Sequence, residues 1–105
     1  MIKQVIDYTG ERDLFVRLLN TTSGNLSRLF TKPCLSRSDS EQVLDTIKVY
    51  RQADDVFDDP DKAREFLKTS IPALNGDMPI DLLDTFSGRQ LVQQLLRKIE
   101  YGDFS

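Results

Sequence analysis

Apolar residues along this chain recur at the spacing of an α-helix, and this periodicity limits the possible folds more than any other feature. The clearest case lies near the C-terminus, where one helix face would carry Leu91, Val92, Leu95, Leu96 and Ile99. The opposite face would carry Arg89, Gln93, Gln94, Arg97 and Lys98. Gly102 follows where helices commonly end in a left-handed residue. The pattern predicts a helix that stops near Tyr101 and leaves residues 102–105 as a tail.

Start and stop signals divide the rest of the chain into further helices. We expect short helices over residues 11–19 and 23–31, a long helix from the Ser36 and Ser38 capping boxes to about Phe57, and a short helix after Asp59-Pro60. Pro79 is expected to start another over residues 80–84, and Thr85 or Ser87 to cap the last one. Residues 1–10 fit an edge strand, a frayed helix or an arm packed on a partner. The predicted fold class is all-α.

Composition narrows the class of protein. At 105 residues the chain forms one domain, or two very small ones that share a core. No apolar run approaches the roughly 20 residues that cross a bilayer, and the start lacks the pattern of a signal peptide, so we expect a cytoplasmic protein without a membrane partner. With no histidine and only Cys34, a zinc site or a histidine-based triad is nearly excluded.

Charge is distributed unevenly between the two halves. Residues 1–52 hold eight cations and six acids, a net charge of +2, whereas residues 53–105 hold six cations and eleven acids, a net charge of −5. Such asymmetry suggests a different partner for each half, although solvated helix faces would also explain it. The acidic residues from Asp54 to Asp61 lack the glycine and the final glutamate of a calcium-binding EF-hand loop.

The two short helices expected over residues 11–31 have the outline of a helix-turn-helix. Between Thr22 and Ser38 there are three cations and no acid, a balance that suits a phosphate backbone. A solvated helix face is the alternative interpretation. The residues predicted to lie near DNA, with Thr22 as the cap, are Thr22, Ser23, Asn25, Arg28 and Lys32. Because one half-site usually binds weakly, a dimer is expected.

The C-terminal motifs resemble those of the Xre/MbcA/ParS antitoxins, partners of RES-domain toxins. They read Ala73-Leu74-Asn75-Gly76, then Pro79-Ile80-Asp81-Leu82-Leu83-Asp84-Thr85-Phe86-Ser87-Gly88, and finally Ile99-Glu100-Tyr101-Gly102. Upstream, residues 17–28 look like the family's degenerate helix-turn-helix, and Phe66 stands where members carry a tryptophan. The resemblance covers about residues 11–105.

The resemblance implies a division into an N-terminal arm (1–10), an Xre-like helix-turn-helix region with a connecting helix (11–57) and a toxin-binding domain (58–105). It implies an antitoxin that blocks the NAD pocket of a NAD-consuming or ADP-ribosylating RES toxin with its C-terminal segment and represses its own operon. The implied toxin-binding residues are Asn75, Gly76, Gly88, Glu100, Tyr101, Gly102, Asp103, Phe104 and Ser105.

Alternatives remain for several of these features. Glu100 and Asp103 could belong to a helix end with a solvated tail, and the protein could be a stand-alone transcriptional regulator without a toxin. Leu91, Leu95 and Ile99 could form a dimer zipper, but the stripe is short and favours core packing. Neither a nucleophile with a base nor a glycine-rich phosphate loop is present, so we expect no enzyme activity and no cofactor.

Overall fold

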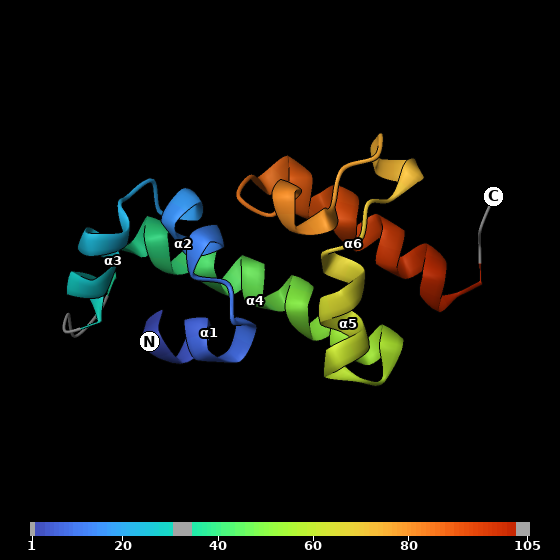
Figure 1. The fold of residues 1–105 in the computed structure, drawn as a ribbon, viewed down its shortest axis with the longest axis horizontal. Helices are drawn as coiled ribbons and strands as arrows, with labels where there is room; N and C mark the ends of the chain where they lie inside the picture. The colour runs from blue at the N-terminus through green and yellow to red at the C-terminus, as the bar shows by residue number, and fades with distance from the viewer. Residues whose placement is uncertain (1, 31–34, 103–105) are drawn as a thin grey trace.

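A computed structural model describes residues 2–30 and 35–102, and within these ranges the protein consists of helices without a strand (Figure 1). This confirms the all-α prediction. The elements are α1 (Ile2–Thr9), α2 (Arg12–Leu18), α3 (Ser23–Leu29), α4 (Arg37–Phe57), α5 (Pro60–Leu67), the 3-10 helices η1 (Pro72–Leu74) and η2 (Pro79–Leu82), and α6 (Phe86–Glu100). None of the helices in the described ranges has the length and hydropathy to cross a membrane.

The long helix α4 forms the axis of the molecule, which measures 45 Å along its longest dimension. Helices α1, α2, α5 and α6 all pack against it, with α1 and α2 toward one end and α5 toward the other (Figure 1). Its N-cap is Ser36, whose side chain accepts a hydrogen bond from the Asp39 backbone at 3.1 Å. Asp58 ends the helix in the left-handed conformation, so the predicted span of α4 is confirmed.

Sequence signals also place the other helix starts. Thr22 accepts a hydrogen bond from the Asn25 backbone, Asp59 accepts one from Asp61, and Thr85 accepts one from Gly88. Each contact satisfies a backbone amide that the first turn would otherwise leave unpaired.

The first ten residues were the hardest to assign from the sequence. Residues 2–9 form helix α1, and Ile2 and Val5 are buried in the core against α4. The segment is therefore part of the same hydrophobic core as the rest of the chain and does not extend away as an arm. The core runs without interruption from α1 to α6, while the functional boundaries predicted near residues 11 and 58 stay predictions.

Helix α6 orients differently from the sequence prediction at two positions. Val92 and Leu96 are fully buried as expected, but Leu91 is 50% exposed. Arg89, which was assigned to the solvent face, is only 2% exposed. The cause lies in α4, which packs against α6 and whose Asp45 and Gln42 side chains accept hydrogen bonds from the Arg89 guanidinium.

A cluster of tyrosines and one arginine joins α1, α4 and α5. The Arg64 guanidinium forms a 2.8 Å ion pair with Asp54 and lies over the rings of Tyr8 and Tyr50, at 5.0 and 4.8 Å from their centroids. The Tyr8 hydroxyl donates to Asp54. Tyr50 is fully buried, and within the described chain its hydroxyl has no hydrogen-bond partner.

Tyr50→Phe is expected to raise the free energy of unfolding by about 1 kcal/mol, because it removes a buried hydroxyl that lost its water without gaining a partner. Burial raises the pKa of Tyr50 above its ordinary value of 10.0, and burial with the Asp54 hydrogen bond raises the pKa of Tyr8. As pH rises past about 10, the hydroxyl groups of these two tyrosines therefore lose their protons in the unfolded chain before they do so in the folded protein.

The contribution of these two tyrosines to stability should consequently be constant below about pH 10 and fall above it, and Tyr50→Phe should make the fall shallower. Urea titrations across this pH range measure both effects. Tyr101→Phe is the matched control, since the Tyr101 side chain is exposed and should leave both quantities unchanged. A less stable Tyr50→Phe variant would contradict the assignment of an unsatisfied hydroxyl.

Candidate functional site

The C-terminal end of α6 presents the most exposed aromatic side chain in the described part of the protein. Tyr101 is 78% exposed and caps the helix through its backbone, which donates to the Arg97 carbonyl at 3.0 Å. Gly102 then adopts φ +70° and donates to the Ile99 carbonyl at 3.2 Å. The predicted stop at Tyr101 and the glycine turn are both confirmed.

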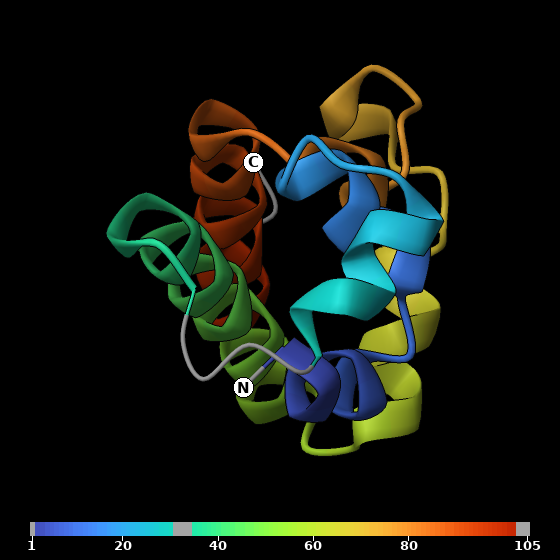
Figure 2. The ribbon, with the colours of Figure 1, turned by 90° about the vertical axis from the view of Figure 1, so that its left-hand side faces the viewer.

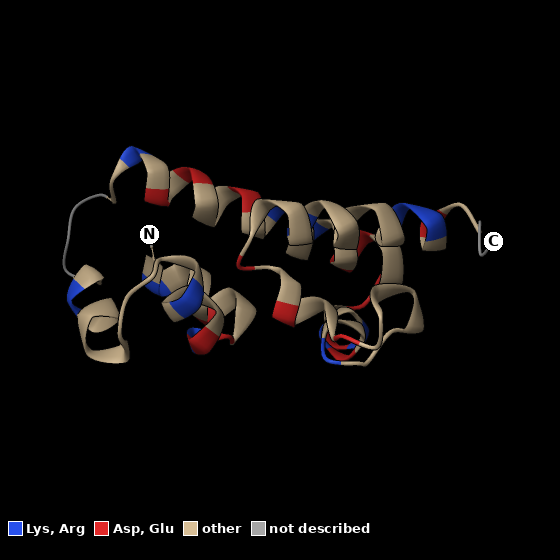
Figure 3. Cartoon of the chain, turned by 90° about the horizontal axis from the view of Figure 1, so that it is seen from above, with Lys and Arg blue, Asp and Glu red and all other residues tan. Residues whose placement is uncertain are grey.

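Charged and amide side chains surround Tyr101. A shallow hollow of about 330 Å³ is lined by Gln94, Arg97, Lys98 and Tyr101, and Glu100 is exposed beside it. Figure 3 shows these charges at the end of α6, which forms one tip of the molecule. An exposed aromatic with a charged rim at a protruding tip is suited to insertion into a partner. The predicted site residues Asp103, Phe104 and Ser105 lie outside the described residues.

Asn75 and Gly76 form a second exposed feature at the same end of the long axis. They take φ values of +59° and +83°, and the Gly76 amide donates to the Ile71 carbonyl at 3.0 Å. Ser70 donates from its hydroxyl to the Gly76 carbonyl, which ties the turn to the end of α5. Figures 1 and 2 show the ribbon of this turn apart from the C-terminal end of α6.

Gly88 was predicted to contact a toxin, but it lies inside the fold. A Cβ built at this position would stand 1.9 Å from the Leu82 carbonyl oxygen and 2.9 Å from the Thr85 hydroxyl. The glycine therefore lets η2 pack directly onto the first turn of α6. Because the residue is buried, a partner cannot reach it, and its role is structural.

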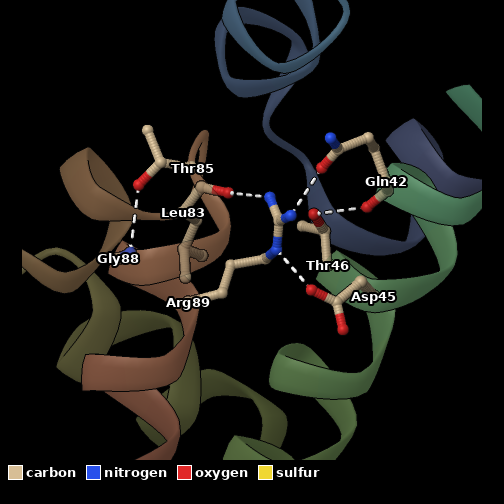
Figure 4. Close-up of polar contacts among 7 residues, drawn as sticks. All are labelled: Gln42, Asp45, Thr46, Leu83, Thr85, Gly88 and Arg89. Carbon is tan, nitrogen blue, oxygen red and sulfur yellow. Dashed lines mark hydrogen bonds and ion pairs between the residues drawn. The ribbon is translucent and has the colours of Figure 1, made fainter. Parts of the chain in front are cut away.

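The residue after it, Arg89, fixes α6 to α4 (Figure 4). Its guanidinium donates to Asp45 at 2.6 Å, to the Gln42 side-chain carbonyl at 2.5 Å and to the Leu83 backbone carbonyl at 2.9 Å. The sequence did contain a signal for this arrangement. Arg89 precedes Val92 by three residues and Leu96 by seven, and residues at that spacing share one helix face.

Helices α2 and α3 carry the predicted DNA-contacting residues. Thr22 is occupied as the N-cap of α3, and Ser23 accepts hydrogen bonds from Arg12 at its hydroxyl (3.1 Å) and its carbonyl (2.8 Å). Arg12 also donates to Ser27 and lies over the Phe30 ring. Arg12, which sequence reasoning missed, thus links α2 to α3 through hydrogen bonds to Ser23 and Ser27.

Asn25 and Arg28 remain exposed on α3, as predicted. Lys32 lies outside the described residues. Thr22 is used as the helix cap and Ser23 as a hydrogen-bond acceptor for Arg12. Of the five predicted DNA-contacting residues, Asn25 and Arg28 are therefore the two on α3 on which the DNA-binding prediction now depends.

The fold and the exposed tip of α6 define a small helical protein with an aromatic side chain presented to solvent at one end. The sequence matches the model of the antitoxin Xre/MbcA/ParS C-terminal toxin-binding domain over residues 52–102. It is also 36% identical over 96 residues to the Prs ADP-ribosylating antitoxin of Sphingobium sp. strain YBL2, covering 83% of this chain and 60% of that protein. Together, the matched toxin-binding domain and the similarity to this relative support an Xre/MbcA/ParS-type antitoxin. It spans about 60% of the length of this relative.

Proposed function

We propose that this protein is the antitoxin of a type II toxin-antitoxin pair and neutralises a RES-domain toxin that consumes NAD or transfers ADP-ribose. The observation that carries the proposal is the tip of α6, where Tyr101 is exposed beyond the last helical turn inside the matched toxin-binding domain. In this proposal the protein acts by binding, without catalysis or a cofactor of its own.

The physical route is steric exclusion of NAD. The C-terminal segment, from Glu100 onward, enters the nucleotide pocket of the toxin, with Tyr101 as an aromatic anchor. Gly102 lets the backbone turn at φ +70°, a conformation that other residues rarely adopt. The Glu100 carboxylate then takes the place of a dinucleotide phosphate against cationic groups of the pocket. The relative's name, which mentions ADP-ribosylation, supports this class of toxin.

Co-expression with the RES-domain toxin that we expect the neighbouring gene to encode tests the partner. A tagged toxin should retain the antitoxin through purification, and cells that express both should grow while cells that express the toxin alone should not. If the two proteins do not co-purify and growth is not rescued, the stand-alone regulator becomes the better account.

DNA binding by α3 is the second part of the proposal, through which the protein represses its own operon. It is supported by the arrangement of α2 and α3, held together by Arg12, and by the exposed Asn25 and Arg28. A homodimer, or a larger complex with the toxin, would present two copies of α3 to two half-sites in the cytoplasm.

Arg28→Ala is expected to weaken operator binding roughly tenfold and to reduce the salt dependence of the affinity by about one counterion, because a phosphate contact is lost. Gel-shift titrations at several salt concentrations measure both. Arg97→Ala, at the far end of the molecule, is the matched control and should bind like the original protein. Equal binding by the Arg28 and Arg97 variants would remove α3 from the DNA interface.

A further inference from the structure

The side chains that line the hollow at the tip of α6 come from one face of the helix. Gln94, Arg97, Lys98 and Tyr101 stand at positions i, i+3, i+4 and i+7, the spacing that places residues above one another on a helix. All four are exposed. The proposed route of inhibition uses the segment from Glu100 onward, and it leaves the two cations of the hollow without a role.

These cations differ in charge from their surroundings. Residues 85–99 hold three cations and no acid, whereas the other residues of the C-terminal half (53–84 and 100–105) hold three cations and eleven acids. Because Arg89 is buried against α4, Arg97 and Lys98 are the exposed charges of residues 85–99. Figure 3 shows the positive charge as a blue band near the C-terminal end of α6. The last turn of α6 is therefore a positive surface on an acidic half.

Within the described part of the chain, neither Arg97 nor Lys98 makes an ion pair or a side-chain hydrogen bond. Cations near the C-terminus of a helix do interact favourably with its dipole. The carbonyls of Arg97 and Ile99, however, already accept hydrogen bonds from the amides of Tyr101 and Gly102. Both cationic groups are therefore available to a partner.

The chemistry of the hollow suits a carboxylate side chain. Its volume is about 330 Å³, and the Tyr101 ring forms one wall. Arg97 and Lys98 add apolar stems, because long cationic side chains cover apolar surface with their methylene groups while the charged ends stay in water. Gln94 contributes an amide that can donate a hydrogen bond. The two cations and the amide can bind carboxylate oxygens, while the apolar walls pack against the methylene groups of the same side chain.

The sign of the charge changes along the tip. Arg97 and Lys98 are positive, and Glu100, two residues after Lys98, begins the anionic end that the proposed function places in the nucleotide pocket. A partner that complements this order is negative where it meets α6 and positive deeper inside. Since a pocket that holds the phosphates of NAD is positive inside, the negative part of the partner has to lie at the entrance.

We propose that Gln94, Arg97, Lys98 and Tyr101 form a docking surface for an acidic segment of the toxin, whose aspartate or glutamate side chains lie at the entrance of the nucleotide pocket. The inference rests on the proposed function and adds the chemistry of the toxin surface to it. Docking of the entrance on the last turn of α6 positions the segment from Glu100 onward to enter the pocket. The two cations also speed up association, because charges at the edge of an interface attract over a distance.

Binding kinetics of the full chain with the RES-domain toxin test this surface. The double variant Arg97→Gln, Lys98→Gln should lower the association rate constant roughly tenfold and make it less dependent on salt, because the attraction of unlike charges is lost. The double variant Arg97→Glu, Lys98→Glu should raise the Kd roughly 100-fold, because like charges then meet. Lys3→Glu with Lys62→Glu is the matched control, since both lysines are exposed outside the hollow and the net charge changes equally. Circular dichroism checks that all variants stay helical.

Carbodiimide cross-linking of the toxin complex identifies the chemistry of the partner. The reagent joins a lysine amine to a carboxylate that touches it, through an amide bond. Mass spectrometry should therefore find Lys98 linked to an aspartate or glutamate of the toxin. Lys98→Arg should keep the affinity and lose this link, because arginine keeps the charge without the reactive amine. A complex in which Lys98 forms no link to a toxin carboxylate would overturn the proposal.

The outcomes separate this inference from the proposed function. If the original protein and both variants at Arg97 and Lys98 bind the toxin equally, the docking surface is wrong and the antitoxin function stands. If the glutamine variant keeps its toxin affinity but loses operator DNA, the surface binds phosphates and the proposal is likewise wrong. If the original protein does not bind the toxin at all, the proposed function fails, and this inference fails with it.

Discussion

Gly88→Ala is expected to lower the free energy of unfolding by about 3 kcal/mol or more. The new methyl group would overlap the Leu82 carbonyl oxygen, and that atom is backbone, which cannot move aside without displacing η2. The displacement would also disturb the Thr85 cap of α6, since the Gly88 amide donates to that hydroxyl at 3.0 Å. Denaturant unfolding measured by circular dichroism gives the size of the effect.

Gly24→Ala provides the matched control for the Gly88 substitution. Gly24 lies in α3, where a Cβ would meet no atom within 4 Å. Alanine there should stabilise the protein by about 0.5–1 kcal/mol, because it reduces the entropy of the unfolded chain. If both glycine substitutions change the free energy of unfolding by similar small amounts, the result would contradict the close packing of η2 on α6.

Arg89→Ala is expected to destabilise the protein by about 3 kcal/mol. The substitution leaves Asp45 without its cation and the Gln42 and Leu83 carbonyls without their donor, in a region where the guanidinium is 2% exposed. Arg97→Ala on the exposed face of the same helix should cost less than about 0.5 kcal/mol. Urea titration of the two variants makes the comparison.

A double-mutant cycle separates the ion pair from the other contacts of Arg89. Combining Arg89→Ala with Asp45→Asn should give a coupling energy of about 1 kcal/mol or more, since the two side chains touch at 2.6 Å. Additive effects of the two substitutions would show that the pair contributes nothing, in contrast to its short distance and its burial.

Helix boundaries could be predicted because they depend on local chemistry. The hydroxyls of Ser36, Thr22 and Thr85 and the carboxylate of Asp59 each bond to a backbone amide only two or three residues away. Residues 2–9 were ambiguous for the opposite reason. Eight residues form a helix of marginal stability, and only contact with α4, far along the sequence, decides their structure.

The site was less predictable, because its residues depend on which helix faces meet. In a 15-residue amphipathic helix, the sequence does not decide whether residues at the border between the apolar and polar faces are buried. Leu91 was assigned to the core and Arg89 to solvent, and both assignments were wrong. The Gly88 motif lies inside the matched toxin-binding domain, but the sequence of a motif does not say whether its glycine faces a partner or a neighbouring carbonyl group. The exposed end at Tyr101 followed from the glycine turn alone.

The most direct test of the proposed function is to titrate the NAD-consuming activity of the RES-domain toxin with two forms of this protein. The full chain should inhibit at a one-to-one ratio of binding sites, and a form that ends at Lys98 should fail to inhibit, while Leu91→Ala should inhibit like the full chain. Because the shortened form keeps the buried Arg89, Val92 and Leu96, its fold can be checked by circular dichroism. Equal inhibition by the folded, shortened form would contradict exclusion of NAD by the C-terminal segment.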